Sequence, residues 1–452
     1  MTSTALSPLP VAAGRFRNTR RFVSDPITLL SDLSARHGDI FRLDLLNGPL
    51  VALTHPRHLR CILQERMSNF TRNTDSYAMI EPFMGRGLAT IADHAKWRRN
   101  RRLAQPAFHH TKIAALGEVM TAAVERTADA WSEIARSGTP IVVNDHMSRL
   151  TLDIVLQALF GMEPDSPELR RFAVAAHHAN TELGRFIRAP FVPLKVPTPG
   201  HRRFWRSIAE LDAIVYGLIA RFRSDATPNR EGLLPMFMDA VDADTGEKLS
   251  DKELRDEVIT MLFAGHETSA LTLTWTLLLM HEHPETLRKV RDEAAETLSG
   301  RTATMADLAQ LPYAKQVLDE VLRLYPPGWQ AYRCAEEDDM IGDYPIAAGS
   351  QIIYSIYHAH RQPEFWRQPL QFDPDRFTPS AVAERDRHAY LPFGIGGHMC
   401  IGNVFALTEM QIALSTLLAR FHLTIPNPDL TPASLLTLNT KTPVVAFLTE
   451  RR

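Results

Sequence analysis

The chain has few cysteines and no long apolar run. Its 452 residues include 3 cysteines, an odd and small number that does not form a disulfide framework and fits a reducing cytoplasm. No uncharged apolar stretch approaches the roughly 20 residues of a membrane-spanning helix. The N-terminal segment is interrupted by prolines and lacks the apolar core of a signal peptide. We therefore expect a cytoplasmic protein without a transmembrane anchor.

A charge excess, internal repeats and low-complexity linkers are also missing. The formal net charge is -2 and 45% of the residues are hydrophobic. A near-neutral balance gives no reason to expect nucleic acid or an anionic membrane as a partner. Because no linker divides a chain that is long enough for a large core, we expect a single domain over residues 1–452 and a monomer.

The order of apolar patterns predicts a mainly helical protein with a smaller β-rich part. Alternating residues on both sides of Asn47-Gly48-Pro49 predict a short hairpin near the start. The expected segments are an N-terminal arm at 1–35, a β-rich lobe mainly at 36–62 and 325–392, and a helical lobe mainly at 85–324 and 401–421.

The clearest predicted helix begins at Ser250 and ends before Pro284. Ser250 and Glu253 have the spacing of a capping box, and Leu249 can pack against Leu254 across it. At ~1.5 Å per residue, such a helix is roughly 48 Å long, which is enough to cross a whole domain.

Residues Phe393 to Gly402 carry the strongest chemical signal. Gly394, Gly396 and Gly397 allow a tight turn. Cys400 follows at the start of the last predicted helix, where free N–H groups and the helix dipole favour a thiolate. A lone cysteine is by default a structural core residue, but a thiolate is also a strong axial ligand of haem iron.

The spacing Phe-x-x-Gly-x-(Arg/His)-x-Cys-x-Gly in this loop resembles, at every position, the signature of the cytochrome P450 family. The resemblance implies a mainly α fold, with a large helical lobe, a small β-rich lobe and haem between the long central helix and the cysteine loop. It implies that Cys400 ligates the iron of haem b, and that Phe393, His398 and Gly402 contact the cofactor. His398 stands where arginine is commoner. O2 would be the co-substrate, with electrons ultimately from NAD(P)H.

In the long helix, Ala264-Gly265-His266-Glu267-Thr268 resembles the family's oxygen-binding stretch. Small side chains at Ala264 and Gly265 let a ligand approach the backbone, and Thr268 can bond to a carbonyl one turn earlier. The plain alternative is a buried helix with a polar notch, but a buried Glu267 without a role would be costly. The resemblance implies catalytic roles for these four residues, with a proton relay through Glu267 and Thr268.

Trp97 and Arg101, one turn apart, resemble the family's helix that faces a haem propionate. His94 precedes them, and Arg333 follows the Pro-Pro turn at another position that usually contacts a propionate. A guanidinium matches a carboxylate with its planar fork. On its own, His94 would be a surface histidine just as readily.

Glu320 and Arg323 lie on one face of a predicted helix and can pair. Their apolar neighbours indicate burial, where an unpaired charge is expensive. By resemblance they form the family's Glu-x-x-Arg pair, and Arg376 completes the network. We expect this network to hold the cysteine loop in place and not to take part in the chemistry.

The resemblance also places substrate contacts in several separate segments. Aromatic residues in such patterns are more often plain core than pocket lining. A proline-rich stretch at 190–200 suggests a stiff loop over the entrance. The pocket residues expected by resemblance are Phe83, Met84, Phe191, Phe263, Pro327, Trp329 and Leu438.

The resemblance implies oxidation of a small, mainly apolar secondary metabolite or lipid-like substrate, by hydroxylation or epoxidation with O2 and two electrons. Oxidative ring closure or C–N/C–C coupling without oxygen insertion is a second possibility. A peroxide-using enzyme and a haem-binding sensor are less well supported, because Glu267 and Thr268 are both present. The sequence does not indicate which substrate is oxidised.

A basic cluster lies beside the predicted haem-facing helix and comprises Arg98, Arg99, Arg101 and Arg102. It is a candidate docking site for an acidic ferredoxin or flavodoxin, which with its reductase would supply the electrons. The alternative is a solvated helix face with propionate pairing. Because the chain ends soon after its last predicted helix, we expect this partner to be a separate protein.

Overall fold

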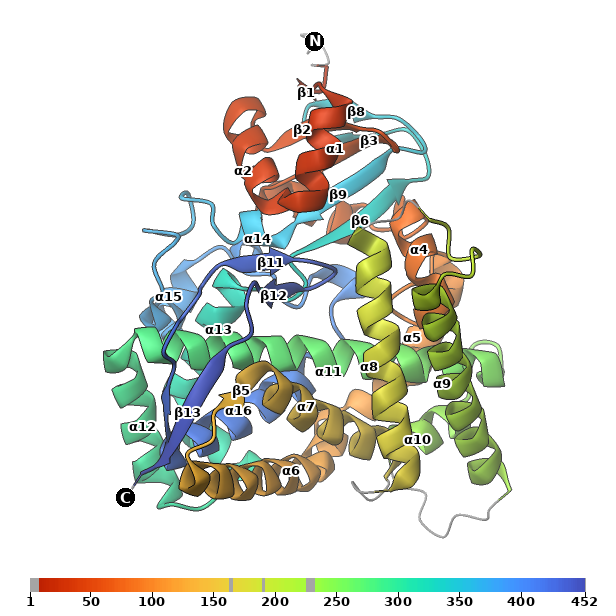
Figure 1. Cartoon of the computed structure of the whole chain (residues 1–452). Helices are drawn as coiled ribbons and strands as arrows, with labels where there is room; N and C mark the ends of the chain where they lie inside the picture. Colours follow the sequence, from red (N-terminus) through yellow and green to blue (C-terminus); the bar gives the residue numbers. More distant parts are fainter. Residues whose placement is uncertain (1–7, 162–165, 189–191, 225–231, 452) are drawn as a thin grey trace.

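The computed structural model describes residues 8–161, 166–188, 192–224 and 232–451. A six-stranded sheet lies at one end of the molecule, and helices make up most of the rest (Figure 1). The strand order in that sheet is β1-β2-β3-β9-β6-β4. These strands are β1 Val11–Ala12, β2 Ile40–Leu45, β3 Gly48–Leu53, β4 Phe70–Thr71, β6 Gln330–Ala335 and β9 Gln351–Ser355.

The sheet joins strands from the N-terminal part of the sequence with strands from residues 330–355. The predicted hairpin is present, with β2 antiparallel to β3 and Leu45 opposite Gly48. On its other side β3 pairs in parallel with β9, which in turn runs antiparallel to β6. β6 therefore carries Arg333 into the interior from a segment far away in sequence.

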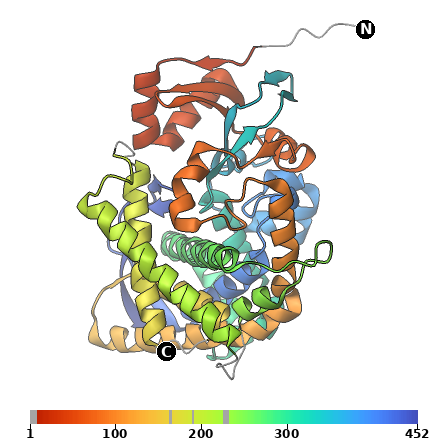
Figure 2. The same cartoon turned by 90° about the vertical axis from the view of Figure 1, so that its right-hand side faces the viewer.

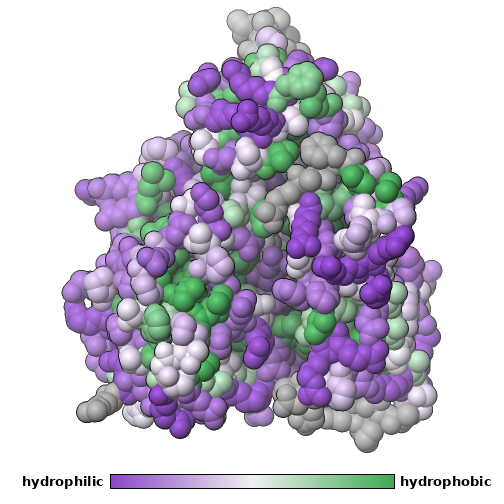
Figure 3. Space-filling model, in the orientation of Figure 1, coloured by the Kyte–Doolittle hydropathy of each residue, from purple (hydrophilic) through white to green (hydrophobic). Residues whose placement is uncertain are grey.

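The helical part is built around α11, which Figure 2 views almost along its axis, with other helices around it. No described helix is long and apolar enough to cross a membrane. Hydrophilic residues cover most of the face in Figure 3, with smaller hydrophobic areas between them. The helices are α1 Arg15–Ser24, α2 Pro26–His37, α3 Pro56–Arg60, α4 Asp75–Met84, α5 His94–Ala104, α6 His110–Ser137, α7 Val143–Phe160, α8 Pro167–Arg188, α9 Pro199–Arg223, α10 Leu233–Asp239, α11 Asp251–Glu282, α12 Pro284–Leu298, α13 Pro312–Leu324, α14 Ile356–Ala359, α15 Pro379–Glu384 and α16 Asn403–Arg420.

Helix α11 has the predicted length and start. It contains 32 residues, and both halves of the capping box between Ser250 and Glu253 are formed. Leu249 and Leu254 are both buried at this end. Further along, nearly every side chain of the helix is buried except for the stretch 263–268. This interruption in the middle of a buried helix marks the candidate site.

Three smaller sheets complete the fold. The β11–β12 hairpin packs on α11, where the Trp275 indole N–H donates to the Leu438 carbonyl at 3.0 Å. The molecule is thus mainly α-helical with small sheets, as predicted. The remaining strands are β5 Ile141–Val142, β7 Asp339–Ile341, β8 Tyr344–Ile346, β10 Phe421–Thr424, β11 Pro432–Ser434, β12 Leu438–Thr440 and β13 Val445–Glu450.

Candidate active site

The cysteine loop is closed by a backbone hydrogen bond from Cys400 N–H to the Phe393 carbonyl, at 2.8 Å. Gly394 and Gly396 have φ angles of 70° and 69°, in the left-handed region. A Cβ added at Gly396 would also lie 2.3 Å from the Leu63 carbonyl oxygen. Glycine at 396 is therefore required both by the turn and by the close contact with the neighbouring helical turn.

The Cys400 side chain is accessible and lies in the loop before α16, which begins at Asn403. Desolvation raises the pKa of its thiol, while the Gly402 N–H and the charge of Arg101 act in the lowering direction. The thiolate expected from the sequence stays a prediction. A bound cation would displace the proton, since thiolate is the form that binds metals.

On α11 the predicted bond of Thr268 is present, with Oγ1 donating to the Ala264 carbonyl at 2.5 Å. Ala264 is exposed although it lies midway along a buried helix. Gly265 points elsewhere: a Cβ there would lie 3.0 Å from Cγ2 of Val155 on α7. Its small size therefore serves close helix packing, and the predicted approach of oxygen to Gly265 stays a prediction.

Glu267 is half-buried, and its carboxyl faces the β11–β12 hairpin, where Thr437 Oγ1 donates to Oε1 at 3.0 Å. Burial raises the pKa of Glu267, which favours the protonated acid. Its neighbour His266 contacts α7 instead, with Nε2 2.8 Å from Ser148 Oγ. Glu267 and Thr268 are adjacent in sequence, but their hydrogen bonds run to different elements.

The predicted propionate contacts gather around His398. Its ring lies edge-on to Trp97, with 4.1 Å between the centroids, and His94 stacks on the other part of this indole at 5.7 Å. Arg101 donates to the Met399 carbonyl at 3.0 Å, next to the cysteine. Arg333 is buried, with its guanidinium 5.3 Å from the Tyr354 ring. Residues from α5, β6 and the cysteine loop thus meet at one place.

Arg72 belongs to the same cluster and was missed by sequence reasoning. Its guanidinium donates to the Leu88 carbonyl at 2.7 Å, and burial, with the nearby charge of Arg333, lowers its pKa. No motif surrounds Arg72 in the sequence, because its neighbours come from β6 and the cysteine loop. We define the cation cluster as Arg72, Arg101 and Arg333, with His94 and His398 beside them.

The cation cluster has too few acceptors of its own. Among the described residues, buried Nε atoms of Arg72 and Arg333 and Nδ1 of His398 have no hydrogen-bond partner. Unpaired buried groups of this kind are costly, and two carboxylates would satisfy them. Burial, with the two arginines, lowers the pKa of His398 to about 2, so this ring is neutral and offers one N–H donor. The cluster fits the propionates of haem.

The predicted Glu320–Arg323 pair is fully buried and bidentate, with N–O distances of 2.6 and 2.7 Å. Arg376 lies further away, 3.6 Å from Glu320. The connection to the cysteine loop runs through His360, another residue that sequence reasoning missed. Its Nδ1 faces the Arg323 carbonyl at 3.2 Å, and its Nε2 accepts the Leu391 N–H at 2.7 Å.

Most of the expected substrate contacts are core residues. Five of the candidates, with Pro327 among them, have buried side chains. Phe83 packs edge-on to Phe263, with 5.5 Å between the centroids, and Phe263 is half-buried. Phe191 lies outside the described residues, as do positions 189 and 190 of the proposed entrance loop. The other buried candidates, whose assignment to the pocket stays a prediction, are Phe83, Met84, Trp329 and Leu438.

The basic cluster at 98–102 is largely neutralised, which weakens it as a docking site. Arg99 pairs with Glu247 and Glu253 at 2.8 and 2.6 Å. Arg102 pairs with Asp242 at 2.8 Å. Sequence spacing could not reveal these acids, because they come from the first turn of α11 and the segment before it. Within the described ranges, Arg98 is exposed and free of ion pairs.

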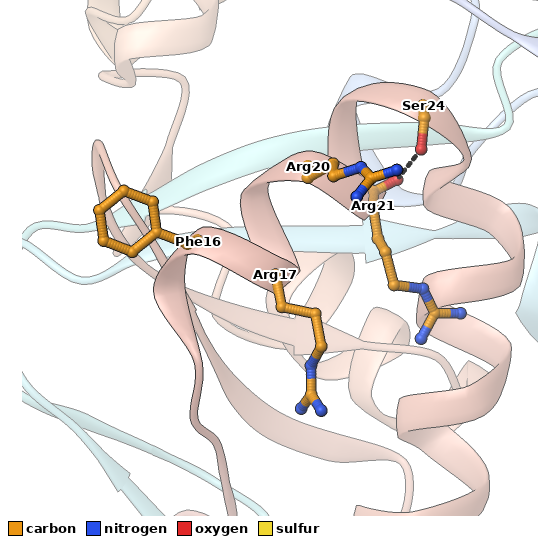
Figure 4. Close-up of a pocket in the computed structure, with 5 residues that line it drawn as sticks. All are labelled: Phe16, Arg17, Arg20, Arg21 and Ser24. Carbon is orange, nitrogen blue, oxygen red and sulfur yellow. Dashed lines mark hydrogen bonds between the residues drawn. The ribbon is translucent and has the colours of Figure 1, made fainter.

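A separate surface hollow lies on α1, between Phe16 and the arginines Arg17, Arg20 and Arg21 (Figure 4). Phe16 is 80% exposed there. The hollow shares no residue with the cysteine loop or with α11. It is therefore not a part of the candidate active site.

Comparisons with known proteins identify the family of this chain. The family model described as Cytochrome P450 matches residues 13–447. The chain belongs to the cytochrome P450 family. Haem and O2-dependent monooxygenation are the properties that membership implies, together with a redox partner and small substrates.

Several cytochrome P450 proteins are similar over almost their whole length. Cyclooctatin synthase of Streptomyces melanosporofaciens is 33% identical over 441 residues, 95% of this chain and 92% of that protein. Pentalenene oxygenase of Streptomyces avermitilis is 32% identical over 447 residues, 97% of this chain and 95% of the relative. The solved heme domain of cytochrome P450DA is 29% identical, with a TM-score of 0.89, and covers 99% of this chain and 98% of the other.

Proposed function

We propose that this enzyme hydroxylates a small, mainly apolar secondary metabolite, with a cyclic terpenoid as the first candidate. The similarity to cyclooctatin synthase and pentalenene oxygenase supports the substrate class. A further relative of Streptomyces melanosporofaciens, 33% identical, is named cyclooctat-9-en-7-ol 5-monooxygenase. The main structural support for this activity is the accessible stretch at Ala264 and Thr268 on an otherwise buried helix, together with an accessible Cys400.

In this proposal Cys400 is the one protein ligand of haem b, and the cation cluster binds the two propionates. The donors other than Cys400 would come from the haem itself. When bound there, haem supplies the activation of O2. Gly396 and the buried network behind it keep the sulfur in place.

The remaining residues handle protons and water. Thr268 holds its hydroxyl against the Ala264 carbonyl, where it can orient a water molecule on the exposed side of α11. Burial raises the pKa of the Glu267 carboxyl, which favours the protonated form in which it can hold and pass on a proton. The apolar surroundings at Phe263 exclude bulk water. Gly265 acts through the packing of α11 against α7.

We further propose that a ferredoxin or flavodoxin with its reductase delivers electrons from NAD(P)H to a monomeric enzyme in the cytoplasm. The docking surface is proposed around the unpaired Arg98, beside α5. This surface is narrower than the basic run in the sequence implies. An acidic partner is expected to bind more weakly as the salt concentration rises.

The test uses the purified holoenzyme with a ferredoxin, its reductase and NADPH. Pentalenene and cyclooctat-9-en-7-ol are compared with a medium-chain fatty acid and a hydrophobic dipeptide. The proposal predicts a spin-state shift and a product heavier by one oxygen for a terpenoid. A product lighter by two hydrogens would indicate oxidative coupling. Turnover of the fatty acid or dipeptide alone would overturn the terpenoid assignment.

A further inference from the structure

The Glu267 carboxyl is held by residues outside its own helix. Thr437 Oγ1 donates to Glu267 Oε1 at 3.0 Å, and the Asn439 amide donates to the same Thr437 oxygen at 3.0 Å. The amide N–H donates to the hydroxyl, which can then give its own proton to the ionised carboxyl. The hairpin thus presents an oriented chain from Asn439 through Thr437 to Glu267.

Helix α8 reaches the same carboxyl. The Asn180 side chain acts to lower the pKa of Glu267, which places it near the carboxyl, whose Oε2 has no hydrogen-bond partner among the described residues. Asn180 is half-buried, whereas Thr437 is buried. Figure 1 shows α8 crossing α11 near the β11–β12 hairpin. Two elements that are separate in sequence therefore converge on one acid in the centre of the molecule.

We propose that Asn180, Thr437 and Asn439 are positioning residues that hold the Glu267 carboxyl and link α8 and the β11–β12 hairpin to proton delivery. This inference rests on the proposed function, in which Glu267 stores the proton. A substrate that moves α8 or the hairpin would change the hydrogen bonds to Glu267. Proton supply would then depend on whether the substrate is bound.

Neutral groups alone surround this acid. The titratable neighbour on α11, His266, bonds to Ser148 of α7, and His177 of α8 acts on His266. In the part of the chain that the structure describes, the pKa of Glu267 responds to burial and to the three hydrogen-bonding side chains, and to no neighbouring charge. A change in these hydrogen bonds is therefore the available way to change the pKa of Glu267.

The experiment follows the Glu267 proton in the holoenzyme. Difference infrared spectra across pH report the protonated carboxyl, and Glu267→Gln identifies its band. Thr437→Val should raise the midpoint by roughly half to one pH unit, as expected for a lost hydrogen bond to the carboxylate. Asn439→Leu should raise it by less, because Asn439 acts through the Thr437 hydroxyl. Thr437→Ser keeps the hydroxyl and should restore the wild-type midpoint.

Thr440→Val is the matched control. Thr440 lies in the same hairpin and is also buried, but its hydroxyl accepts from Asn144 at 3.1 Å. It should leave the infrared midpoint unchanged. An unchanged midpoint in Thr437→Val, or an equal shift in Thr440→Val, would overturn the proposal.

A second measurement connects the acid to catalysis. The fraction of electrons recovered as product, against peroxide released, is measured across pH with a bound substrate. In Thr437→Val, the inflection of this pH profile should move to higher pH, as the infrared midpoint does. An infrared shift without a shift in this profile would contradict the link to proton delivery. The infrared titration needs no turnover, so its result stands even if the terpenoid assignment fails.

Discussion

His360 Nε2 accepts a hydrogen bond from the backbone N–H of Leu391, at 2.7 Å, at the start of the cysteine loop. On its other side the ring faces the carbonyl of Arg323. Burial lowers the pKa of His360 to about 3, so the ring is neutral and carries its proton on Nδ1. The histidine therefore connects the buried Glu320–Arg323 pair to the loop that carries Cys400.

Replacing His360 with phenylalanine should loosen this loop. The change preserves bulk but leaves the Leu391 N–H buried without an acceptor, at a cost of about 1–3 kcal/mol. Urea unfolding measures this loss, and absorbance of purified protein measures haem retention. The control is His358→Phe, because His358 is also buried but bonds to Ser355 on the sheet side. Both variants should lose stability, and only His360→Phe should lose haem. Equal haem loss would contradict the connection.

Gly396→Ala should damage the loop by two mechanisms. Its φ of 69° is strained for alanine, and the new Cβ would lie 2.3 Å from the Leu63 carbonyl. Gly349→Ala separates the backbone strain from the close contact, because Gly349 has a φ of 78° and a Cβ added there would have no atom within 4 Å. We expect about 1 kcal/mol for Gly349→Ala and at least about 3 kcal/mol for Gly396→Ala. Equal losses in thermal unfolding would show that the close contact relaxes freely.

Glu409 in α16 makes the stability of the fold depend on pH. Both of its carboxylate oxygens are buried without a hydrogen-bond partner in the described residues, and burial raises its pKa to about 8. An acid with a raised folded pKa stabilises the fold below its unfolded pKa and loses that contribution as pH rises toward 8. Glu409→Gln should therefore gain stability relative to wild type with rising pH, by at most about 1.4 kcal/mol per unit. A pH-independent difference in urea unfolding between pH 5 and 8, values chosen to bracket the transition, would refute this.

Arg72 should be as important for haem retention as the arginines in recognisable motifs. Arg72→Ala removes a buried cation whose Nε has no partner in the described chain, so a propionate would lose a charge-assisted bond. We expect faster haem transfer to apomyoglobin, by about tenfold, for a loss of ~1.4 kcal/mol. Arg17→Ala, on the exposed face of α1, is the control. Equal transfer rates in the two variants would remove Arg72 from the cation cluster.

The parts of the site that could be predicted from the sequence depend on local spacing. The capping box of Ser250, the pairing of Glu320 with Arg323 and the bond of Thr268 each join residues three or four positions apart. Arg72 and His360 could not be predicted from the sequence, because only tertiary packing brings them to their partners. Aromatic residues such as Phe83 could not be divided into core and pocket, since both environments favour the same side chains.

Spectroscopy of the reduced, carbon-monoxide-bound holoenzyme tests the central claim most directly. If Cys400 is the anionic sulfur ligand of the iron, the Soret band is shifted to the red in the manner of thiolate coordination, and Cys400→Ser abolishes that band. Thermal unfolding of the variant checks that the chain still folds. A Soret band without the shift in the wild type, or an unchanged spectrum in Cys400→Ser, would contradict the account.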